Sequence, residues 1–386
     1  IHPPSNCGGG AMSASILVVV RVVAAAFLFL LGLLAVFKAP FYILWKPAVA
    51  ATAWGHLLAL FALGIAALAP FDRSSHLATA LALSAALLLV SPWIRAWVAA
   101  PAIPSAFSKA IAPAQGPALT WAGLLGPRSG TATLSHHTYR PQLDLDLYMH
   151  SDTEGPRPLI IAIHGGSWQG GDQTQLPAIN HHLASLGYAV AAIRYRLAPA
   201  SRYPDMHDDI EAAIVWLQHH AKDLGLDPDR VVLLGRSAGG HLALSAGYTS
   251  SNPAIRGVVA LYPPTDMHWS WAHPGNPLVI DTHGTLRVLL GGAPDEAKDL
   301  YDAASPIQHV QPSTPPTLLL HGTRDELVFP IQSRRLAEQL KHHGVRHLAI
   351  ELPWATHGFD ANLGGPGGQI YVWALERFLA HVFNDA

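Results

Sequence analysis

The chain has little charge and almost no cysteine. Cys7 is the single cysteine among 386 residues, so neither an intramolecular disulfide nor a thiolate metal cluster can form. Charged residues make up only 13% of the sequence and the formal net charge is −2. Such a composition offers no basic field to attract a nucleic-acid backbone. We therefore expect no nucleic-acid partner.

The sequence also lacks the spacings that hold metals and nucleotides. Its 23 histidines occur mostly as surface-type pairs such as His136-His137 and His342-His343, without HExxH or a comparable ligand spacing. Neither a GxGxxG motif nor a P-loop is present. We therefore expect no metal site and no nucleotide cofactor.

Long apolar runs are abundant in the first hundred residues. Residues 16–37 are apolar except for Arg21, residues 48–68 are apolar except for His56, and a third run covers 76–98. Each is close to the about 20 residues that cross a bilayer as a helix. We interpret residues 1–100 as a membrane-anchor region with three transmembrane helices. A buried helical hairpin is the alternative, and a signal peptide would explain only the first run.

The charges between these runs predict an orientation. One side of the membrane would hold most of the basic residues, namely Lys38, Lys46, Arg95 and Lys109. The other side has only Arg73, beside Asp72. By the positive-inside rule, this integral membrane protein would place its C-terminal domain on the cytoplasmic face. Met12 is a more plausible start than Ile1, and the residues before it are then upstream translation or added sequence.

The remainder of the chain divides into a linker and a larger domain. Residues 101–130 are rich in Pro, Ala, Gly and Ser without strong periodicity, which is typical of a linker. Over residues 131–386, short apolar runs alternate with amphipathic segments. The expected strands are 131–139, 143–149, 159–164, 189–195, 231–234, 255–261, 317–321 and 348–352, and the expected helices are 176–186, 205–221, 241–249, 332–343 and 369–383. This alternation predicts an α/β fold with a mostly parallel sheet covered on both faces.

Ser237 stands in a motif that predicts a nucleophile. The run Gly235-Arg236-Ser237-Ala238-Gly239-Gly240 directly follows the apolar strand 231–234, as in a nucleophile elbow. Small residues on both sides, Gly235 and Gly239, allow the strained turn and the approach of a substrate carbonyl.

A serine nucleophile needs a base and an acid that orients the base. In this kind of sheet both follow the serine in the chain and lie at strand ends. Asp325 follows strand 317–320 and His357 follows strand 348–352. We expect His357 to act as general base and then general acid, oriented by Asp325. The alternatives are Glu326 or Asp360 for the acid and His321 for the base, although His321 is better explained as structural.

The segment 164–168 predicts the remaining part of an acyl-transfer site. His164-Gly165-Gly166-Ser167-Trp168 follows the strand 159–163 and exposes backbone N–H groups that carry no side chain. Together with the N–H of Ala238, those of Gly165 and Gly166 are the expected oxyanion donors.

Five motifs in this order resemble the α/β-hydrolase superfamily. They are His164–Trp168, Tyr195-Arg196-Leu197-Ala198-Pro199, Gly235–Gly240, His321–Asp325 and His357-Gly358-Phe359. The most similar branches are the hormone-sensitive-lipase-like esterases and the bacterial acetyl and feruloyl esterases. The resemblance implies an α/β-hydrolase fold and a serine carboxylester hydrolase that needs no metal or organic cofactor. Two residues depart from the pattern. Arg236 stands where the lipase-like branch usually has an acidic residue, and Ser167 stands in place of a third glycine.

The residues around the motifs suggest the substrate. The segment 262–305, with its tryptophans and prolines, is placed to act as a lid or pocket wall. Trp168, Tyr195 and Phe359 are candidate substrate-binding residues. Because no cationic cluster accompanies them, we expect uncharged small-molecule or lipid esters of short to medium acyl chain. The alternatives are an acetyl-sugar esterase, a feruloyl or aryl esterase, a formamidase, and a catalytically silent membrane-anchored binding domain.

Overall fold

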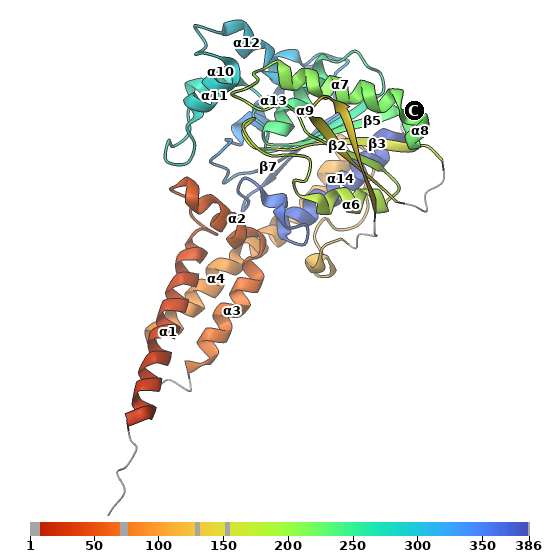
Figure 1. The fold of residues 1–386 in the computed structure, drawn as a ribbon. Helices are drawn as coiled ribbons and strands as arrows, with labels where there is room; N and C mark the ends of the chain where they lie inside the picture. Colours follow the sequence, from red (N-terminus) through yellow and green to blue (C-terminus); the bar gives the residue numbers. More distant parts are fainter. Residues whose placement is uncertain (1–7, 70–75, 128–131, 151–154, 385–386) are drawn as a thin grey trace, which may run out of the picture.

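The computed structural model describes residues 8–69, 76–127, 132–150 and 155–384. Arg73 and Asp72, on which part of the orientation argument depends, lie outside these ranges, as does Cys7. A long bundle of N-terminal helices extends from a larger α/β body (Figure 1).

Eight strands form one sheet in the order β1-β2-β4-β3-β5-β6-β7-β8. Their bounds are β1 Thr133–Arg140, β2 Leu143–Met149, β3 Arg157–Ile163, β4 Ala189–Ile193, β5 Leu226–Arg236, β6 Ile255–Leu261, β7 Thr317–Gly322 and β8 His347–Leu352. The pairs β1–β2 and β2–β4 are antiparallel, and all other neighbours are parallel. The predicted mostly parallel sheet is thus confirmed. Its central strands are continuous apolar runs because helices cover them on both faces.

Alternate side chains of each central strand enter two separate cores. Ile161 of β3 packs with the first core, which includes residues of α7 and α9, whereas Ile160 packs with the second core, which includes residues of α6 and α14. The helix bounds are α5 Ile103–Ala110, α6 Pro177–Ser185, α7 Asp205–His219, α8 Ala221–Leu224, α9 Ala238–Thr249, α10 Met267–Ala272, α11 Thr282–Leu290, α12 Lys298–Ala303, α13 Ile331–His342 and α14 Pro366–Asn384. Because β4, β3, β5, β6, β7 and β8 run parallel to one another, their carboxyl ends meet the same edge of the sheet.

The expected linker is wrong for much of its length. Within residues 101–130, α5 buries Ile103 and Phe107, and Leu119 is buried further on, all in the second core. The ring of Phe107 meets that of Trp373 in α14 edge to face, with centroids 5.5 Å apart. The spacing of four residues between Ile103 and Phe107 gives α5 one apolar face, which the Pro- and Ala-rich composition obscures.

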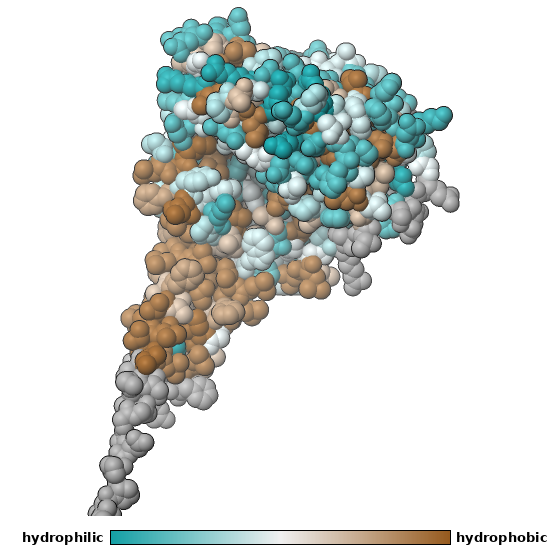
Figure 2. Space-filling view, in the orientation of Figure 1, coloured by the Kyte–Doolittle hydropathy of each residue, from teal (hydrophilic) through white to brown (hydrophobic). Residues whose placement is uncertain are grey.

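Within its described residues, the N-terminal region forms four α-helices. They are α1 Gly8–Leu33, α2 Trp45–Ala53, α3 Gly55–Ala67 and α4 His76–Ala99. The windows Ile16–Leu33 and His76–Ala110 are long and apolar enough to cross a membrane, and α2 with α3 would make a third span if the bent pair is counted as one. The face of the bundle seen in Figure 2 is apolar. Large apolar side chains are exposed on the bundle; for example, Phe61 is 74% exposed and Leu87 is 70% exposed.

The expectation of one continuous helix over 48–68 is wrong. The pair α2 and α3 is bent by 83° at Trp54. The Ala53 carbonyl accepts a hydrogen bond from the Asn362 side chain at 2.9 Å. Gly55 lies so close to α4 that a Cβ there would come within 2.2 Å of the Leu89 carbonyl oxygen. The bend therefore lies where the chain contacts both the α/β body and α4.

Candidate active site

Ser237 occupies the turn between β5 and α9 in a strained conformation, with φ 53° and ψ −121°. A Cβ at Gly235 would lie 2.0 Å from the Gly239 carbonyl oxygen, and a Cβ at Gly239 would lie 2.2 Å from the Ile163 carbonyl oxygen. Both positions therefore require glycine. The Ser237 N–H donates to the Leu261 carbonyl at 2.9 Å and holds the turn against β6.

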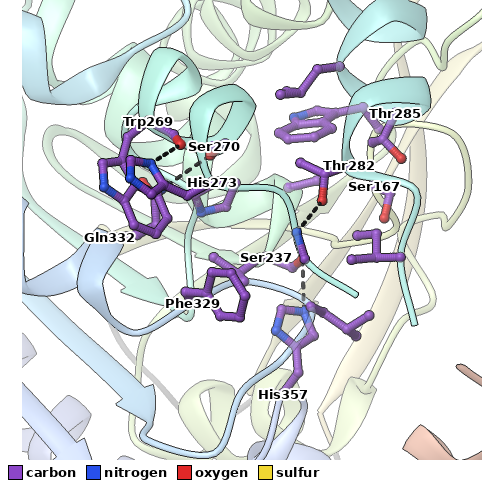
Figure 3. Close-up of a pocket in the computed structure, with 18 residues that line it drawn as sticks. Ser167, Ser237, Trp269, Ser270, His273, Thr282, Thr285, Phe329, Gln332 and His357 are labelled. Atoms are coloured by element: carbon purple, nitrogen blue, oxygen red, sulfur yellow. Dashed lines mark hydrogen bonds between the residues drawn. The ribbon is translucent and has the colours of Figure 1, made fainter. Parts of the chain in front are cut away.

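The structure brings Ser237, His357 and Asp325 into one hydrogen-bonded chain. The Ser237 hydroxyl lies 2.9 Å from His357 Nε2 (Figure 3). On the other side of the ring, His357 Nδ1 lies 2.6 Å from Asp325 Oδ2. The second carboxylate oxygen of Asp325 accepts the backbone N–H groups of Leu327 and Val328, each at 2.9 Å. This is the geometry in which an imidazole can take the serine proton while a carboxylate holds its tautomer.

Asp325 is completely buried yet ionised. Burial by itself would raise its pKa, but the positive charge that His357 can carry and hydrogen bonds from His321 and His357 lower the pKa to about 2. His321 approaches the same carboxylate oxygen as His357, with Nε2 3.3 Å from Asp325 Oδ2. Its ring also bonds to the Ser333 hydroxyl at 2.7 Å and the Val328 carbonyl at 2.9 Å. His321 thus supports the acid rather than the nucleophile.

A buried ion pair joins the nucleophile turn to the histidine loop. The guanidinium of Arg236 bonds to the carboxylate of Asp360, and both residues are only 3% exposed. The Tyr262 hydroxyl donates to the other oxygen of Asp360 at 2.5 Å. Burial raises the pKa of Tyr262, and the Asp360 charge raises it further. Asp360 is therefore engaged here instead of orienting His357. Arg236, which departs from the family pattern, has a structural partner in Asp360.

The oxyanion loop differs from the expectation at one residue. The N–H of Gly165 donates to Gln175 Oε1 at 2.8 Å, so it is not free to bind an oxyanion. Among the described residues, the N–H groups of Gly166, Ser167 and Ala238 have no hydrogen-bond acceptor. Gly166 has φ 130°, and a Cβ there would lie 2.0 Å from the Gly170 carbonyl oxygen. The geometry therefore replaces Gly165 by Ser167 as a candidate donor, beside Gly166 and Ala238.

Two cavities meet at Ser237. The first, which we call the lid-side cavity, has a volume of about 80 Å³ and is walled by the segment 262–305 (Figure 3). That segment contributes Pro264, Trp269, Ser270, His273, Gly275, Ile280, Thr282, Thr285 and Leu286. The expected lid segment does therefore line a cavity beside the nucleophile.

The second cavity, which we call the interfacial cleft, is larger, at about 700 Å³. One wall comes from the N-terminal region, through Tyr42, Trp45, Lys46, Val49 and Trp54. The opposite wall is the oxyanion loop and the loop after β8. Ser167, Ser237, Ile280, Leu327 and His357 line both cavities.

Only one of the three candidate substrate-binding residues faces a cavity. Trp168 lines the lid-side cavity, and its Nε1 donates to His241 Nδ1 at 3.1 Å. Tyr195 is fully buried, stacks on His164 at 4.2 Å between centroids and donates to the His164 carbonyl. Phe359 is buried against Tyr262. The assignment of Tyr195 and Phe359 to substrate binding is thus wrong, because their rings support the two loops from within the core.

In the part of the chain that the structure describes, no three His, Cys, Asp or Glu side chains converge where a metal ion could bind. That the protein needs no metal stays a prediction. The groups that are assembled can accept a proton from Ser237 and can donate hydrogen bonds to a developing oxyanion.

Comparisons with known proteins agree with this fold. Residues 145–340 match the BD-FAE family model. A probable carboxylic ester hydrolase, LipM, of Mycobacterium tuberculosis is 30% identical over 65% of this chain and 61% of its own length. Esterase LipC of the same organism is 32% identical, over 62% of each chain. The chain thus spans about three fifths of the curated relatives it matches.

Solved structures of esterases share the fold. A thermophilic esterase of Thermogutta terrifontis, solved with propionate bound, superposes with a TM-score of 0.55 and 27% identity, covering 64% of this chain and 94% of that one. With the family match over half of the sequence, this likeness agrees with the eight-stranded, mostly parallel sheet. The chain belongs to the BD-FAE family of hormone-sensitive-lipase-like α/β-hydrolases.

Proposed function

We propose that this chain is a serine carboxylester hydrolase that cleaves uncharged esters through an acyl-enzyme on Ser237. The observation that carries the proposal is the continuous chain of hydrogen bonds from Asp325 through His357 to Ser237. Relatives named as esterases support the same reaction class.

The first half-reaction forms the acyl-enzyme. Ser237 Oγ bonds to the ester carbonyl carbon while its proton moves to His357 Nε2. The carbonyl oxygen becomes an oxyanion, which the N–H groups of Gly166, Ser167 and Ala238 bind. His357 then donates its proton to the ester oxygen, the bond between the carbonyl carbon and that oxygen breaks, and the alcohol leaves.

The second half-reaction restores the enzyme. Water gives a proton to His357 Nε2 and bonds to the acyl carbon. Collapse of the intermediate breaks the bond to Ser237 Oγ, which regains its proton from His357, and the carboxylic acid leaves. Asp325 stays ionised throughout and stabilises the imidazolium in both half-reactions.

The lid-side cavity favours a short group on one side of the ester carbonyl. Its volume of about 80 Å³ is roughly half of the ~150 Å³ cavity that holds a benzene ring. Trp168, Trp269 and Phe329 give it aromatic walls. A short to medium acyl chain, as expected from the sequence, is compatible with these dimensions.

The N-terminal helices would anchor this site at a bilayer. The apolar surface of α1, α3 and α4 is the surface that a membrane would cover. In that arrangement the domain from residue 131 onward would face the cytoplasm, and residues 262–305 would serve as the lid.

A nitrophenyl-ester series of rising acyl length, assayed with the full chain in detergent, tests the proposal. We expect hydrolysis that Ser237→Ala abolishes and that the control Ser251→Ala, an exposed serine, leaves unchanged. Equal rates for the parent and Ser237→Ala would refute the assignment. Activity confined to feruloyl or formamide substrates would move it to one of the alternative hydrolases, and inactivity on every substrate would favour a binding domain.

A further inference from the structure

The helix α2 touches the loop that carries the base. Trp45 Nε1 donates a 2.9 Å hydrogen bond to the backbone carbonyl of His357, and the two rings lie 6.1 Å apart. At Gly358 a Cβ would meet Trp45 at 3.5 Å and Val49 at 3.7 Å, so α2 and this loop are in van der Waals contact. The N-terminal region is therefore part of the surroundings of the active site and not only an anchor.

The end of α1 touches the loop that carries the acid. Arg324, the residue before Asp325, is buried and donates to the carbonyls of Leu34 and Ala35 just beyond α1. The Ala35 carbonyl also accepts from Arg95 of α4 at 2.6 Å. A cation at a helix C-terminus is favourable, because the last carbonyls there lack partners within the helix. Both catalytic loops are thus joined to helices of the N-terminal region.

The interfacial cleft lies where these contacts are made. Its N-terminal wall consists of Tyr42, Trp45, Lys46, Val49 and Trp54. Tryptophan, tyrosine and lysine are the side chains that gather at the headgroup level of a membrane. In Figure 1, α2 lies next to the α/β body while α1, α3 and α4 extend away from it. With these helices in a bilayer, the mouth of the cleft would open at the membrane surface.

The two cavities at Ser237 differ greatly in size, at about 80 Å³ and about 700 Å³. An ester bound at Ser237 has its acyl and alcohol parts on either side of the carbonyl carbon, so one part enters each cavity. The small cavity admits a short group only, whereas the large cleft has room for a long chain.

We propose that the interfacial cleft binds the long apolar chain of an ester that remains partitioned in the bilayer, with the short part of the ester in the lid-side cavity. The inference rests on the proposed function and names its substrate class: membrane-dissolved esters with one long chain. The N-terminal wall of the cleft then determines the preference for chain length. The substrate reaches Ser237 sideways from the membrane surface instead of from water.

The full chain in phosphatidylcholine vesicles tests this inference. The substrates are butyl acetate, hexadecyl acetate, methyl hexadecanoate and hexadecyl hexadecanoate. The parent should prefer an ester with one long chain, on either side of the carbonyl, over butyl acetate by at least tenfold in kcat/KM. It should cleave the ester with two long chains at least tenfold more slowly than the better single-chain ester.

Variants of the cleft wall complete the test. Val49→Trp should narrow the cleft and lower the ratio of long-chain to short-chain kcat/KM at least tenfold. Ile43→Trp is the matched control, since Ile43 is 79% exposed and is not among the cleft-lining residues. If Val49→Trp fails to fold, Tyr42→Ala replaces it, because Tyr42 lines the cleft but is 57% exposed. In Tyr42→Ala, the ratio of long-chain to short-chain kcat/KM should fall at least threefold.

The outcomes separate this inference from the proposed function. Butyl acetate hydrolysis that Ser237→Ala abolishes establishes the esterase by itself. With that established, an unchanged ratio in both cleft variants, or efficient cleavage of the ester with two long chains, overturns the cleft assignment. A parent that cleaves none of the esters overturns the proposed function and the inference built on it.

Discussion

Arg236 and Asp360 form a buried ion pair that connects the turn at Ser237 to the loop that carries His357. The strands that carry Ser237 and His357, β5 and β8, are separated in the sheet by β6 and β7. The distance between Ser237 and His357 therefore depends on contacts between their loops. The ion pair supplies one such contact, and the hydrogen bond of Tyr262 to the same carboxylate reinforces it.

Removing one partner of this pair should be costly. Asp360→Asn leaves the Arg236 charge buried without its counterion, which typically lowers the free energy of unfolding by about 3–5 kcal/mol. Chemical denaturation followed by circular dichroism measures the loss. The control is Glu351→Gln, which breaks an ion pair with Arg334 that is 48% exposed on the arginine side and should cost at most about 1 kcal/mol. Equal losses of unfolding free energy in the two variants would contradict a structural role for the Arg236–Asp360 ion pair.

Gly239 should not tolerate even one added methyl group. Gly239→Ala would place a Cβ 2.2 Å from the Ile163 carbonyl oxygen, at the point where α9 meets β3. We expect the variant to lose nearly all esterase activity or to fail to fold. The matched control is Gly64→Ala in α3, where nothing lies within 4 Å of the added Cβ. Activity and melting temperature measured on both variants decide the point, and an active Gly239→Ala would show that the turn is less tightly packed.

Asp325→Asn should reduce turnover far more than it changes binding. The amide cannot stabilise the imidazolium and favours the wrong tautomer of His357, an effect of about 10⁴-fold on kcat in a comparable triad. The measurement is kcat and KM on a short nitrophenyl ester. If kcat falls less than tenfold, another carboxylate orients the base, and Glu326→Gln would then identify it.

The ionisation of Asp325 predicts how stability depends on pH. Its pKa of about 2 lies below the ordinary value of 3.8, so the folded state binds this proton less readily than the unfolded chain. The stabilisation is therefore present above about pH 4 and is lost as the pH falls from about 4 to 2. The unfolding free energies of the parent and Asp325→Asn should converge across this window. A difference that stays constant down to pH 2 would contradict the low pKa.

The N-terminal helices should keep the chain in membranes. After carbonate washing of membranes from expressing cells, we expect the full chain in the pellet. A reporter that is active only in the cytoplasm, fused to the C-terminus, should be active if the charge bias sets the orientation. A fusion that is active only with an external reporter would reverse the orientation, and release by carbonate would contradict the membrane anchor.

The sequence alone was enough to predict that the three proposed catalytic residues lie together. Ser237, Asp325 and His357 each follow a short apolar run, and the carboxyl ends of parallel strands meet at one edge of the sheet. Local pattern and chain order therefore predicted which three residues would lie together, and the structure brings them together. The need for glycine at positions 235 and 239 was also predictable, because the turn that these two residues permit is local.

Contacts between distant segments were decided only by the tertiary structure. Tyr195 and Phe359 were expected in the pocket because they lie near strand ends, but a ring there can turn into the core, and packing decides which way it turns. Gly165 was expected to be a free donor, but Gln175 occupies its N–H. Residues 103–119 and the bend at Trp54 depend on neighbours elsewhere in the chain. Trp45 reaches the carbonyl of His357 across 312 positions of sequence, and no local pattern encodes such a contact, because its energy comes from how two separate surfaces fit together.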